Sequence, residues 1–464
     1  MMATLSSVLF LSPWSSCLVA LAFQARQPPS SYHRIEVTSL QSYLATSIDI
    51  SESAPRNVAS LYSWAGDYGI QTTPGFELAS DDGLDVYAIT NQYLPADSPI
   101  LCIPNELILS GRKAREELGG GSTENNPAEQ TLINLETSEH MSEISKSISQ
   151  FYLFLKVLKE YELGAESPWY PWLDSLPRYF SNGASMTDFC FGCLPPYAAQ
   201  QALDERKRLE NFIRALHDVP YISQDSKNNV ALTTWAFSVV QTRYQEMEED
   251  GDLCLAPMAD FFNHGGAEGV DVYVTFDDDG NCYAYSTREV GAGEPLRLCY
   301  GDSTNPSQLL AKFGFLDESS PATFCKYIIH NPPAEIFDMG YPTGMLFYQN
   351  GGISNEVWDV LLYNELGKIS LQEQQAFYQA HMMGDDATKQ GYHNQYFSQT
   401  FAELQRHVNH ILNEVEELGI GLETQVDQGK DRERHPRLPL LMRHNEFVKN
   451  TFELVQQNMD TMVS

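Results

Sequence analysis

Basic residues are scarce in this sequence. Its 464 residues include 29 lysines and arginines against 62 aspartates and glutamates, which gives a formal net charge of -33. Nucleic-acid phosphates and anionic membrane surfaces both attract a basic face, so the shortage argues against a nucleic-acid partner and against binding at a membrane surface. The acidic excess would suit a basic protein partner, through an attraction that salt screens, and it would equally serve solubility alone.

Cysteine is also scarce, and the eight cysteines are spread too thinly for a disulfide framework. Cys190 and Cys193 form a lone Cys-x-x-Cys pair. A structural zinc site needs about four ligands, and no second pair or nearby histidine pair completes this one. Asp260 and His264 are four residues apart and could share a helix face as metal ligands, but no third ligand accompanies them. We therefore expect no metal site.

The sequence lacks an uninterrupted apolar run long enough for a stable membrane span. Its most apolar stretch, residues 4–23, is broken by Pro13 and ends in small residues before Phe23. Residues 24–34 contain two arginines and no acidic residue. This pattern resembles a signal peptide followed by the presequence of algal secondary plastids. We predict plastid import, with a cytoplasmic or secretory location as the alternative, and set residues 1–55 aside as a targeting leader and disordered segment.

The remaining chain is long enough for two or three lobes. Strand-like runs at residues 85–89 and 100–103 flank a polar turn, and alternation with period two returns after residue 270. Residues 277–281 are typical of a hairpin turn and lack the spacing of an EF-hand. Apolar residues recur at helical spacing between 145 and 247, and the chain returns to helical patterns after residue 322.

The most informative polar residues lie within 253–315. Asn263 and His264 follow an apolar run directly, and Tyr300 ends a strand-like segment before a Gly-Asp turn. Alone, an Asn-His pair is typical of a helix end and a tyrosine of a packed aromatic side chain. The order of five segments is more specific than any one of them: SPWYPWLDSLP, WAFSVVQTR, PMADFFNH, REVGAGEPLRLCYGDSTN and LLAKFGF.

These segments resemble, in order and spacing, the SET-domain protein methyltransferases of the Rubisco large-subunit lysine methyltransferase branch. The resemblance implies an α+β fold, with a SET-domain β-fold over residues 56–318, a helical insert at about 125–247, and an all-helical, substrate-binding-like lobe over 319–464. It implies a monomer that transfers a methyl group from S-adenosylmethionine to a lysine of a protein substrate with a basic or lysine-bearing segment. A histidine acceptor, a protein-binding SET scaffold with little or no turnover, and a metal-dependent hydrolase are the alternatives.

Methyl transfer from a sulfonium to an amine is an in-line displacement, which requires close alignment and a neutral amine. A lysine with a pKa of about 10.4 is mostly protonated at neutral pH, and a dry channel near positive charge favours loss of that proton. A few well-placed polar groups around the reacting atoms are then sufficient.

The resemblance also assigns site residues. Tyr300 would border the methyl-transfer pore and orient the amine, as the catalytic residue. Thr242 and Asp260 would lie near the substrate lysine. Six residues would contact the cofactor: Asp82, Leu84, Arg243, Asn263, His264 and Phe313.

The first cofactor loop departs from the family pattern. The family has a second glycine in a Gly-Leu-Gly-Leu-type turn, whereas here the run is DDGLDVYA with Asp85 in that place. Glycine would permit close backbone approach or a positive φ, and Asp85 adds a charge. We expect this loop to weaken cofactor binding. Two smaller departures are Phe313, where tyrosine is common, and Thr242, where serine is more frequent.

Overall fold

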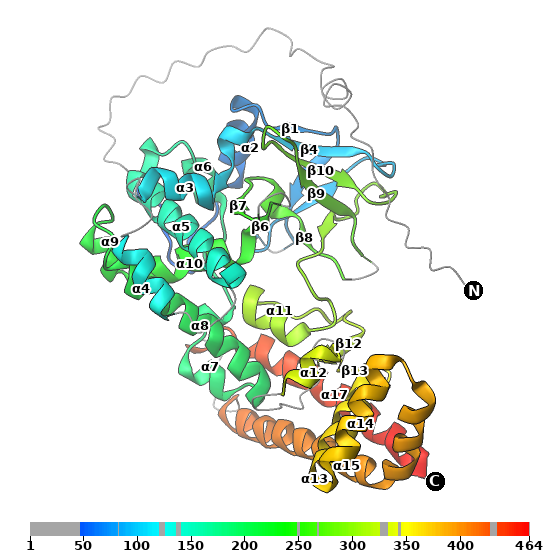
Figure 1. Ribbon diagram of the computed structural model, residues 1–464. Helices are drawn as coiled ribbons and strands as arrows, with labels where there is room; N and C mark the ends of the chain where they lie inside the picture. The colour runs from blue at the N-terminus through cyan, green and yellow to red at the C-terminus, as the bar shows by residue number, and fades with distance from the viewer. Residues whose placement is uncertain are drawn as a thin grey trace, which may run out of the picture.

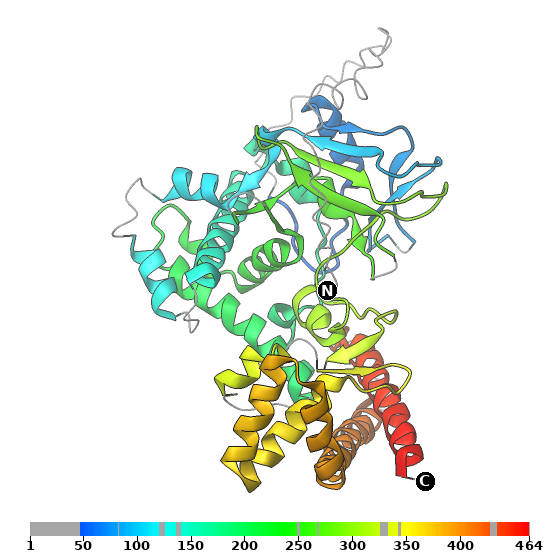
Figure 2. The ribbon, with the colours of Figure 1, turned by 45° about the vertical axis from the view of Figure 1, so that its right-hand side comes forward.

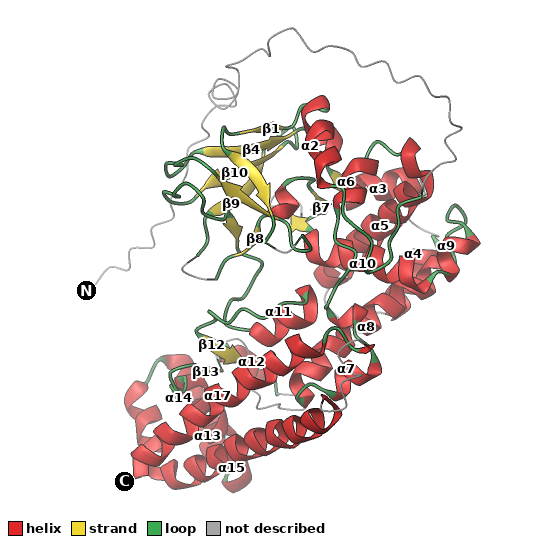
Figure 3. Cartoon of the chain, turned by 180° about the vertical axis from the view of Figure 1, so that it is seen from behind, coloured by secondary structure: helices red, strands yellow, loops and turns green. Residues whose placement is uncertain are grey.

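The chain folds into a lobe that contains most of the strands and a lobe that is mostly helical, as Figures 1 and 3 show from opposite sides. No helix in the described part of the chain is both long and apolar enough to cross a membrane. Of the predicted leader and disordered segment 1–55, residues 1–46 lie outside the described residues, as does Asp82, so the predictions made for them stay predictions. Residues 47–55 are described, and Ile48 among them is buried in the core. The computed structural model describes residues 47–81, 83–119, 126–135, 141–247, 251–266, 269–324, 333–341, 345–426 and 434–463.

Short strands form several small sheets around the candidate site. A four-stranded antiparallel sheet has the order β1-β4-β10-β9, and β2 pairs with β3. A three-stranded sheet has the order β5-β7-β6, and β8 pairs in parallel with β11. The strands are β1 (Gln71–Thr72), β2 (Phe76–Ala79), β3 (Tyr87–Thr90), β4 (Pro99–Ile103), β5 (Leu109–Ser110), β6 (Gln245–Glu246), β7 (Leu253–Leu255), β8 (Asn263–His264), β9 (Val272–Phe276), β10 (Cys282–Ser286) and β11 (Arg297–Leu298).

The hairpin predicted from the period-two alternation is confirmed by the pairing of β9 with β10. Cys282 lies opposite Phe276, and the backbone N–H of Asp277 donates to the carbonyl of Asn281 across the turn. Gly280 takes a φ of 79°, a left-handed conformation that glycine adopts without strain. Hydrogen bonding of β10 to β4 then extends the hairpin into the four-stranded sheet.

Helices of the insert pack against these sheets. The apolar stripes that the sequence predicted on α5 and α8 are core, as expected: Phe151 and Phe212 are fully buried, with ring centroids 5.3 Å apart. The helix α10 is buried on most sides and ends at the candidate site. The helices of this lobe are α2 (Val58–Asp67), α3 (Gly111–Leu118), α4 (Pro127–Leu135), α5 (Met141–Leu163), α6 (Tyr170–Ser175), α7 (Asp188–Gly192), α8 (Pro196–Leu216), α9 (Gln224–Asn228), α10 (Val230–Arg243) and α11 (Pro306–Phe313), with the 3-10 turns η1 (Asn105–Leu107), η3 (Gly164–Glu166), η4 (Gly183–Ser185) and η5 (Ala259–Phe261).

The second lobe has its own core, and its long helix α15 lies beside α17 (Figure 2). The sequence predicted an all-helical lobe, but β12 and β13 form an antiparallel pair there. Runs of three residues are too short for periodicity to distinguish strand from helix. The domain limits proposed from the sequence stay a prediction. The elements are β12 (Ala322–Phe324), α12 (Ala334–Asp338), β13 (Leu346–Tyr348), α13 (Asn355–Ile369), α14 (Leu371–Met383), α15 (Asp386–Val426) and α17 (Leu438–Val463).

Helix α17 ties the two lobes together through buried polar contacts. His444 Nε2 lies 2.9 Å from Ser307 Oγ on α11, and Asn445 Nδ2 donates to the carbonyl of Cys193 at 2.7 Å. Cys190 and Cys193 are both buried in the small core at this junction. The junction fixes α11, whose C-terminal end lies at the candidate site.

Candidate active site

A parallel strand pair brings the Asn-His pair and Tyr300 together. After β7 the chain takes a positive φ of 79° at Met258, passes through η5, and forms β8. In the pairing of β8 with β11, Asn263 lies opposite Arg297 and His264 opposite Leu298. Because Tyr300 comes two residues after the end of β11, it lies beside the Asn-His pair. The pair is therefore part of a strand and not a helix end.

The imidazole of His264 holds the backbone of Tyr300. His264 Nδ1 accepts the backbone N–H of Tyr300 at 3.2 Å, so the ring proton of the neutral form belongs on Nε2. That nitrogen lies 3.5 Å from Asp317 Oδ2. Burial lowers the pKa of His264, and the carboxylate of Asp317 raises it again in part. The side chain of His264 thus positions Tyr300, and the predicted cofactor contact of His264 stays a prediction.

Tyr300 has both of its hydrogen-bonding groups engaged. Its hydroxyl donates to the carbonyl of Phe262 at 2.7 Å. Burial raises the pKa of Tyr300, Arg243 lowers it, and the carboxylates of Asp260 and Asp85 raise it further. The hydroxyl therefore stays protonated at neutral pH and can orient a neighbouring group without acting as a base.

Aromatic rings surround Tyr300. The ring centroid of Phe313 lies 5.0 Å away, that of His264 5.4 Å and that of Phe315 6.2 Å. Phe313 comes from the end of α11 and Phe315 from the residues just after it, with Gly314 between them at a φ of 83°. The turn at Gly314 lets Phe313 and Phe315, on either side of it, both face Tyr300.

Arg243 and Asp260 form a buried ion pair at the end of α10. Arg243 Nη1 donates to the backbone carbonyl of Asp260 and lies 3.2 Å from its Oδ2. Trp172 Nε1 donates to the same Oδ2 at 3.0 Å. Burial raises the pKa of Asp260, and Arg243 opposes that shift. The carboxylate of Asp260 thus holds Arg243, and the predicted place of Asp260 near the substrate stays a prediction.

A cavity of about 350 Å³ collects most of these side chains. Thr242 also lines it, although its hydroxyl already donates to the carbonyl of Ser238 within α10. Lys312 and Tyr244 also line the cavity and were not predicted from the sequence. Lys312 Nζ donates to Tyr244 Oη at 2.8 Å. Lys312 lies in the LLAKFGF segment, which was the available signal for it. The predicted site residues that line the cavity are Thr242, Arg243, Asp260, Tyr300 and Phe313.

The loop before β3 forms a charged edge beside this cavity. Asn263 Nδ2 donates to Asp85 Oδ2 at 3.0 Å. The carbonyl of Leu84 accepts Arg56 Nη1 at 2.7 Å, while the Leu84 side chain is 70% exposed. Arg56 was not predicted, because nothing in its surrounding sequence marks an arginine that ends near residues 84–85.

The guanidinium groups of Arg56 and Arg243 lie 5.7 and 5.6 Å from the ring centroid of Phe261. Burial and the nearby Arg243 lower the pKa of Arg56 to about 9, and Asp85 and Asp260 raise it. Arg56 is therefore still charged at neutral pH. One nitrogen of each arginine, Arg56 Nη2 and Arg243 Nε, is buried without a hydrogen-bond partner among the described residues.

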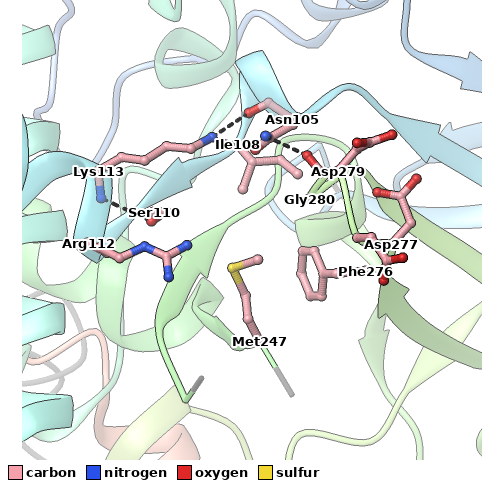
Figure 4. A pocket seen from close by; sticks show the side chains of 11 residues that line it. Asn105, Ile108, Ser110, Arg112, Lys113, Met247, Phe276, Asp277, Asp279 and Gly280 are labelled. Atoms are coloured by element: carbon pink, nitrogen blue, oxygen red, sulfur yellow. Dashed lines mark hydrogen bonds between the residues drawn. The ribbon is translucent and has the colours of Figure 1, made fainter. Parts of the chain in front are cut away.

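A second cavity, of about 360 Å³, adjoins the first and shares Phe276 with it (Figure 4). Lys113 Nζ donates to the carbonyl of Asn105 at 3.0 Å, and Asn281 Nδ2 donates to Asp277 Oδ2 at 2.9 Å. In both hydrogen bonds the donor and the acceptor belong to the protein, so we assign these groups a structural role. No group of three or more metal-ligating side chains is brought together in the part of the chain that the structure describes.

The whole chain was compared with known proteins and solved structures. No protein-family model matches the chain. It is 24% identical over 189 residues to SET domain-containing protein 4 of Homo sapiens, covering 37% of this chain and 42% of that protein. The Mus musculus protein of the same name is 26% identical over 182 residues, covering 36% and 41%. The chain thus spans less than half the length of these curated relatives.

Solved structures match over a larger part of the chain. The SET domain of LSMT bound to lysine and AdoHcy matches with a TM-score of 0.57 at 13% identity, covering 87% of this chain and 91% of that one. Rubisco LSMT bound to AdoMet matches with a TM-score of 0.57 at 13% identity, covering 88% and 92%. The chain therefore has the mixed α+β fold of these SET-domain structures, so the predicted fold class is confirmed, and its sequence is similar to SET domain-containing proteins, as the resemblance predicted.

Proposed function

We propose that this protein is a protein-lysine methyltransferase that uses S-adenosylmethionine. The observation that carries the proposal is the convergence of five residues on one cavity, since they come from separate segments that the sequence resemblance assigns to one site. These residues are Thr242, Arg243, Asp260, Tyr300 and Phe313. Structures of similar fold whose names include bound AdoMet, AdoHcy and lysine support the same chemistry.

The charged edge of the site fits the amino-acid end of this cofactor. Buried charged donors are stabilised by an anion, and Arg56 Nη2 and Arg243 Nε are two such donors without a partner in the described chain. A carboxylate would satisfy both of them. S-adenosylmethionine, when bound, supplies an activated methyl group on a positively charged sulfur.

The aromatic side of the site fits an uncharged amine. The rings of Tyr300 and Phe313 exclude water, and exclusion of water disfavours an ammonium ion relative to a neutral amine. Arg243 and Lys312 line the cavity together with Asp260 and Glu246, so the charges of its walls balance and the exclusion of water carries this argument. The protonated hydroxyl of Tyr300 is held by the carbonyl of Phe262, where it can orient an entering amine.

A SET scaffold that binds protein without turnover is the second candidate. The observation that favours it is the hydrogen bond from Asn263 to Asp85, because it engages an amide that the family resemblance assigns to the cofactor. Calorimetric titration of the full chain with S-adenosylmethionine separates the two. Binding in the micromolar range supports the enzyme, and absence of binding supports the scaffold.

The acceptor is tested by incubating the protein and isotope-labelled S-adenosylmethionine with a plastid or whole-cell extract. Mass spectrometry of the labelled proteins identifies the modified residue. Label on lysine supports the proposal, and label on histidine would redirect it to a histidine acceptor. We further propose that residues 1–60 direct a fluorescent fusion to a plastid, and a diffuse cytosolic signal would contradict that location alone.

A further inference from the structure

The carboxylate of Asp85 lies where the family pattern has glycine, and the structure removes the backbone argument against it. A side chain at this position would be strained if its φ were positive. The described non-glycine residues with positive φ are Asp97 and Met258, and Asp85 is not one of them. Gly83 adopts a φ of 77° in the same loop and supplies the conformation for which glycine is needed. Asp85 is therefore accommodated without backbone strain.

The side chain of Asp85 forms one half of an acceptor pair. Asn263 Nδ2 donates to Asp85 Oδ2 at 3.0 Å, so the amide of Asn263 turns its nitrogen toward the carboxylate. The Oδ1 of Asn263 and the negatively charged carboxylate of Asp85 both bring acceptor oxygens to this point. Asp85 is exposed and Asn263 is partly exposed, so a ligand can reach both.

Donors and acceptors are arranged as an amino-acid site. Arg56 and Arg243 present buried, unpartnered nitrogens that suit a carboxylate, and Asp85 and Asn263 present oxygens that suit an ammonium group. The carboxylate of Asp85 interacts electrostatically with Arg56 and Tyr300, so it lies within range of the same site. Repulsion between Asp85 and the carboxylate of a ligand is limited because the two guanidinium groups provide a separate place for that anion.

We propose that Asp85 binds the α-ammonium group of S-adenosylmethionine, with Asn263 as the second acceptor. This inference rests on the proposed function and assigns a residue to it. Without a ligand, the charges at this edge sum to zero. The two arginines, Arg56 and Arg243, are balanced by the two aspartates, Asp85 and Asp260. S-adenosylmethionine carries a net positive charge, whereas S-adenosylhomocysteine is a neutral zwitterion. Loss of Asp85 leaves a positive site, and therefore weakens binding of the methylated cofactor more than binding of its product.

The test is calorimetry on the full chain with three probes: S-adenosylmethionine, S-adenosylhomocysteine and 5′-methylthioadenosine, which lacks the amino-acid end. Asp85→Asn keeps the size of the side chain and removes its charge. We expect it to weaken S-adenosylmethionine binding by roughly tenfold or more, because hydrogen bonds to charged groups are the stronger ones. Binding of S-adenosylhomocysteine should weaken less, and binding of 5′-methylthioadenosine should be unchanged.

Asp81→Asn is the matched control, since it removes a carboxylate from the same loop at a position where that carboxylate accepts Tyr87 Oη at 3.1 Å. It should bind all three probes as the wild type does. Equal or tighter binding of S-adenosylmethionine by Asp85→Asn or Asp85→Gly would overturn the proposal for Asp85 and leave the proposed function standing. Equal weakening of all three probes would also overturn it, by showing a general effect on the loop. A wild-type protein that binds none of the probes contradicts both proposals.

Discussion

The two sides of the candidate site differ in how their polar groups are paired. On the aromatic side, the N–H and O–H of Tyr300 both have partners, in His264 and the carbonyl of Phe262. On the charged side, Arg56 and Arg243 each keep a buried nitrogen with no partner among the described residues. Paired groups fix a geometry before any ligand arrives, whereas unpaired buried donors cost free energy that a ligand can offset. The aromatic side therefore holds Tyr300 in place, and the charged side has donors available for a ligand.

The largest expected effect breaks the charged side. Arg243→Met strands the carboxylate of Asp260, whose side chain is fully buried, with only Trp172 as a side-chain donor. Removal of one partner from a buried ion pair typically costs about 3–5 kcal/mol of stability. We expect a loss of that size in the free energy of unfolding, measured by urea denaturation, together with loss of S-adenosylmethionine binding.

The double variant Arg243→Met, Asp260→Asn supplies the control for this prediction. Without the stranded charge, most of the stability should return, while cofactor binding should not. Arg406→Met removes an exposed arginine that pairs with Glu403 on α15, and it should change stability little. If Arg243→Met alone is as stable as the wild type, the ion pair does not hold the end of α10.

A smaller effect breaks the aromatic side. Tyr300→Phe removes one hydroxyl and leaves the ring contacts with Phe313 and Phe315 intact. We expect kcat to fall by roughly tenfold to a hundredfold, since in the proposed function the hydroxyl orients the reacting amine, and the dissociation constant of S-adenosylmethionine to stay within about twofold. Steady-state kinetics on an identified substrate and calorimetry measure the two quantities. Full activity in the variant would remove the Tyr300 hydroxyl from the reaction.

The same contrast explains what the sequence could predict. Asn263, His264 and Tyr300 could be assigned as candidate site residues because they lie within or next to characteristic apolar segments. Arg56 was missed because its role depends on Leu84 and on Phe261, which lie about thirty and two hundred residues away and meet it only in the fold. Local patterns record strands and turns, and they do not record which distant charge a loop will meet.

Two details of the site could not be predicted from the sequence, for related reasons. The strain attributed to Asp85 assumed a positive φ, and the structure places the left-handed residue at Gly83 instead. The resemblance placed Asp260 near the substrate, and the structure places it at the cavity with its carboxylate turned to Arg243 and Trp172. Backbone φ and side-chain direction at a single residue follow from the packing around it, so a motif fixes the position of such a residue better than its role.

The smallest expected effect concerns His264, whose ring bonds to the backbone of Tyr300, and it appears only as a function of pH. Burial lowers the pKa of His264 in the folded protein below its usual value of about 6.5. The unfolded chain therefore binds the proton more readily, so stability is fully present above that pH and falls as the pH drops through the folded-state pKa. Protonation also removes the lone pair on Nδ1 that accepts the Tyr300 N–H. We expect urea denaturation at pH 7.5 and 5.5 to show a loss of stability at the lower pH that is smaller in His264→Gln, which keeps an acceptor but cannot titrate. The corresponding change at the exposed His410 on α15 should leave the wild-type pH dependence in place. Identical pH dependence in His264→Gln and wild type would mean that the imidazole does not hold Tyr300 through its neutral form.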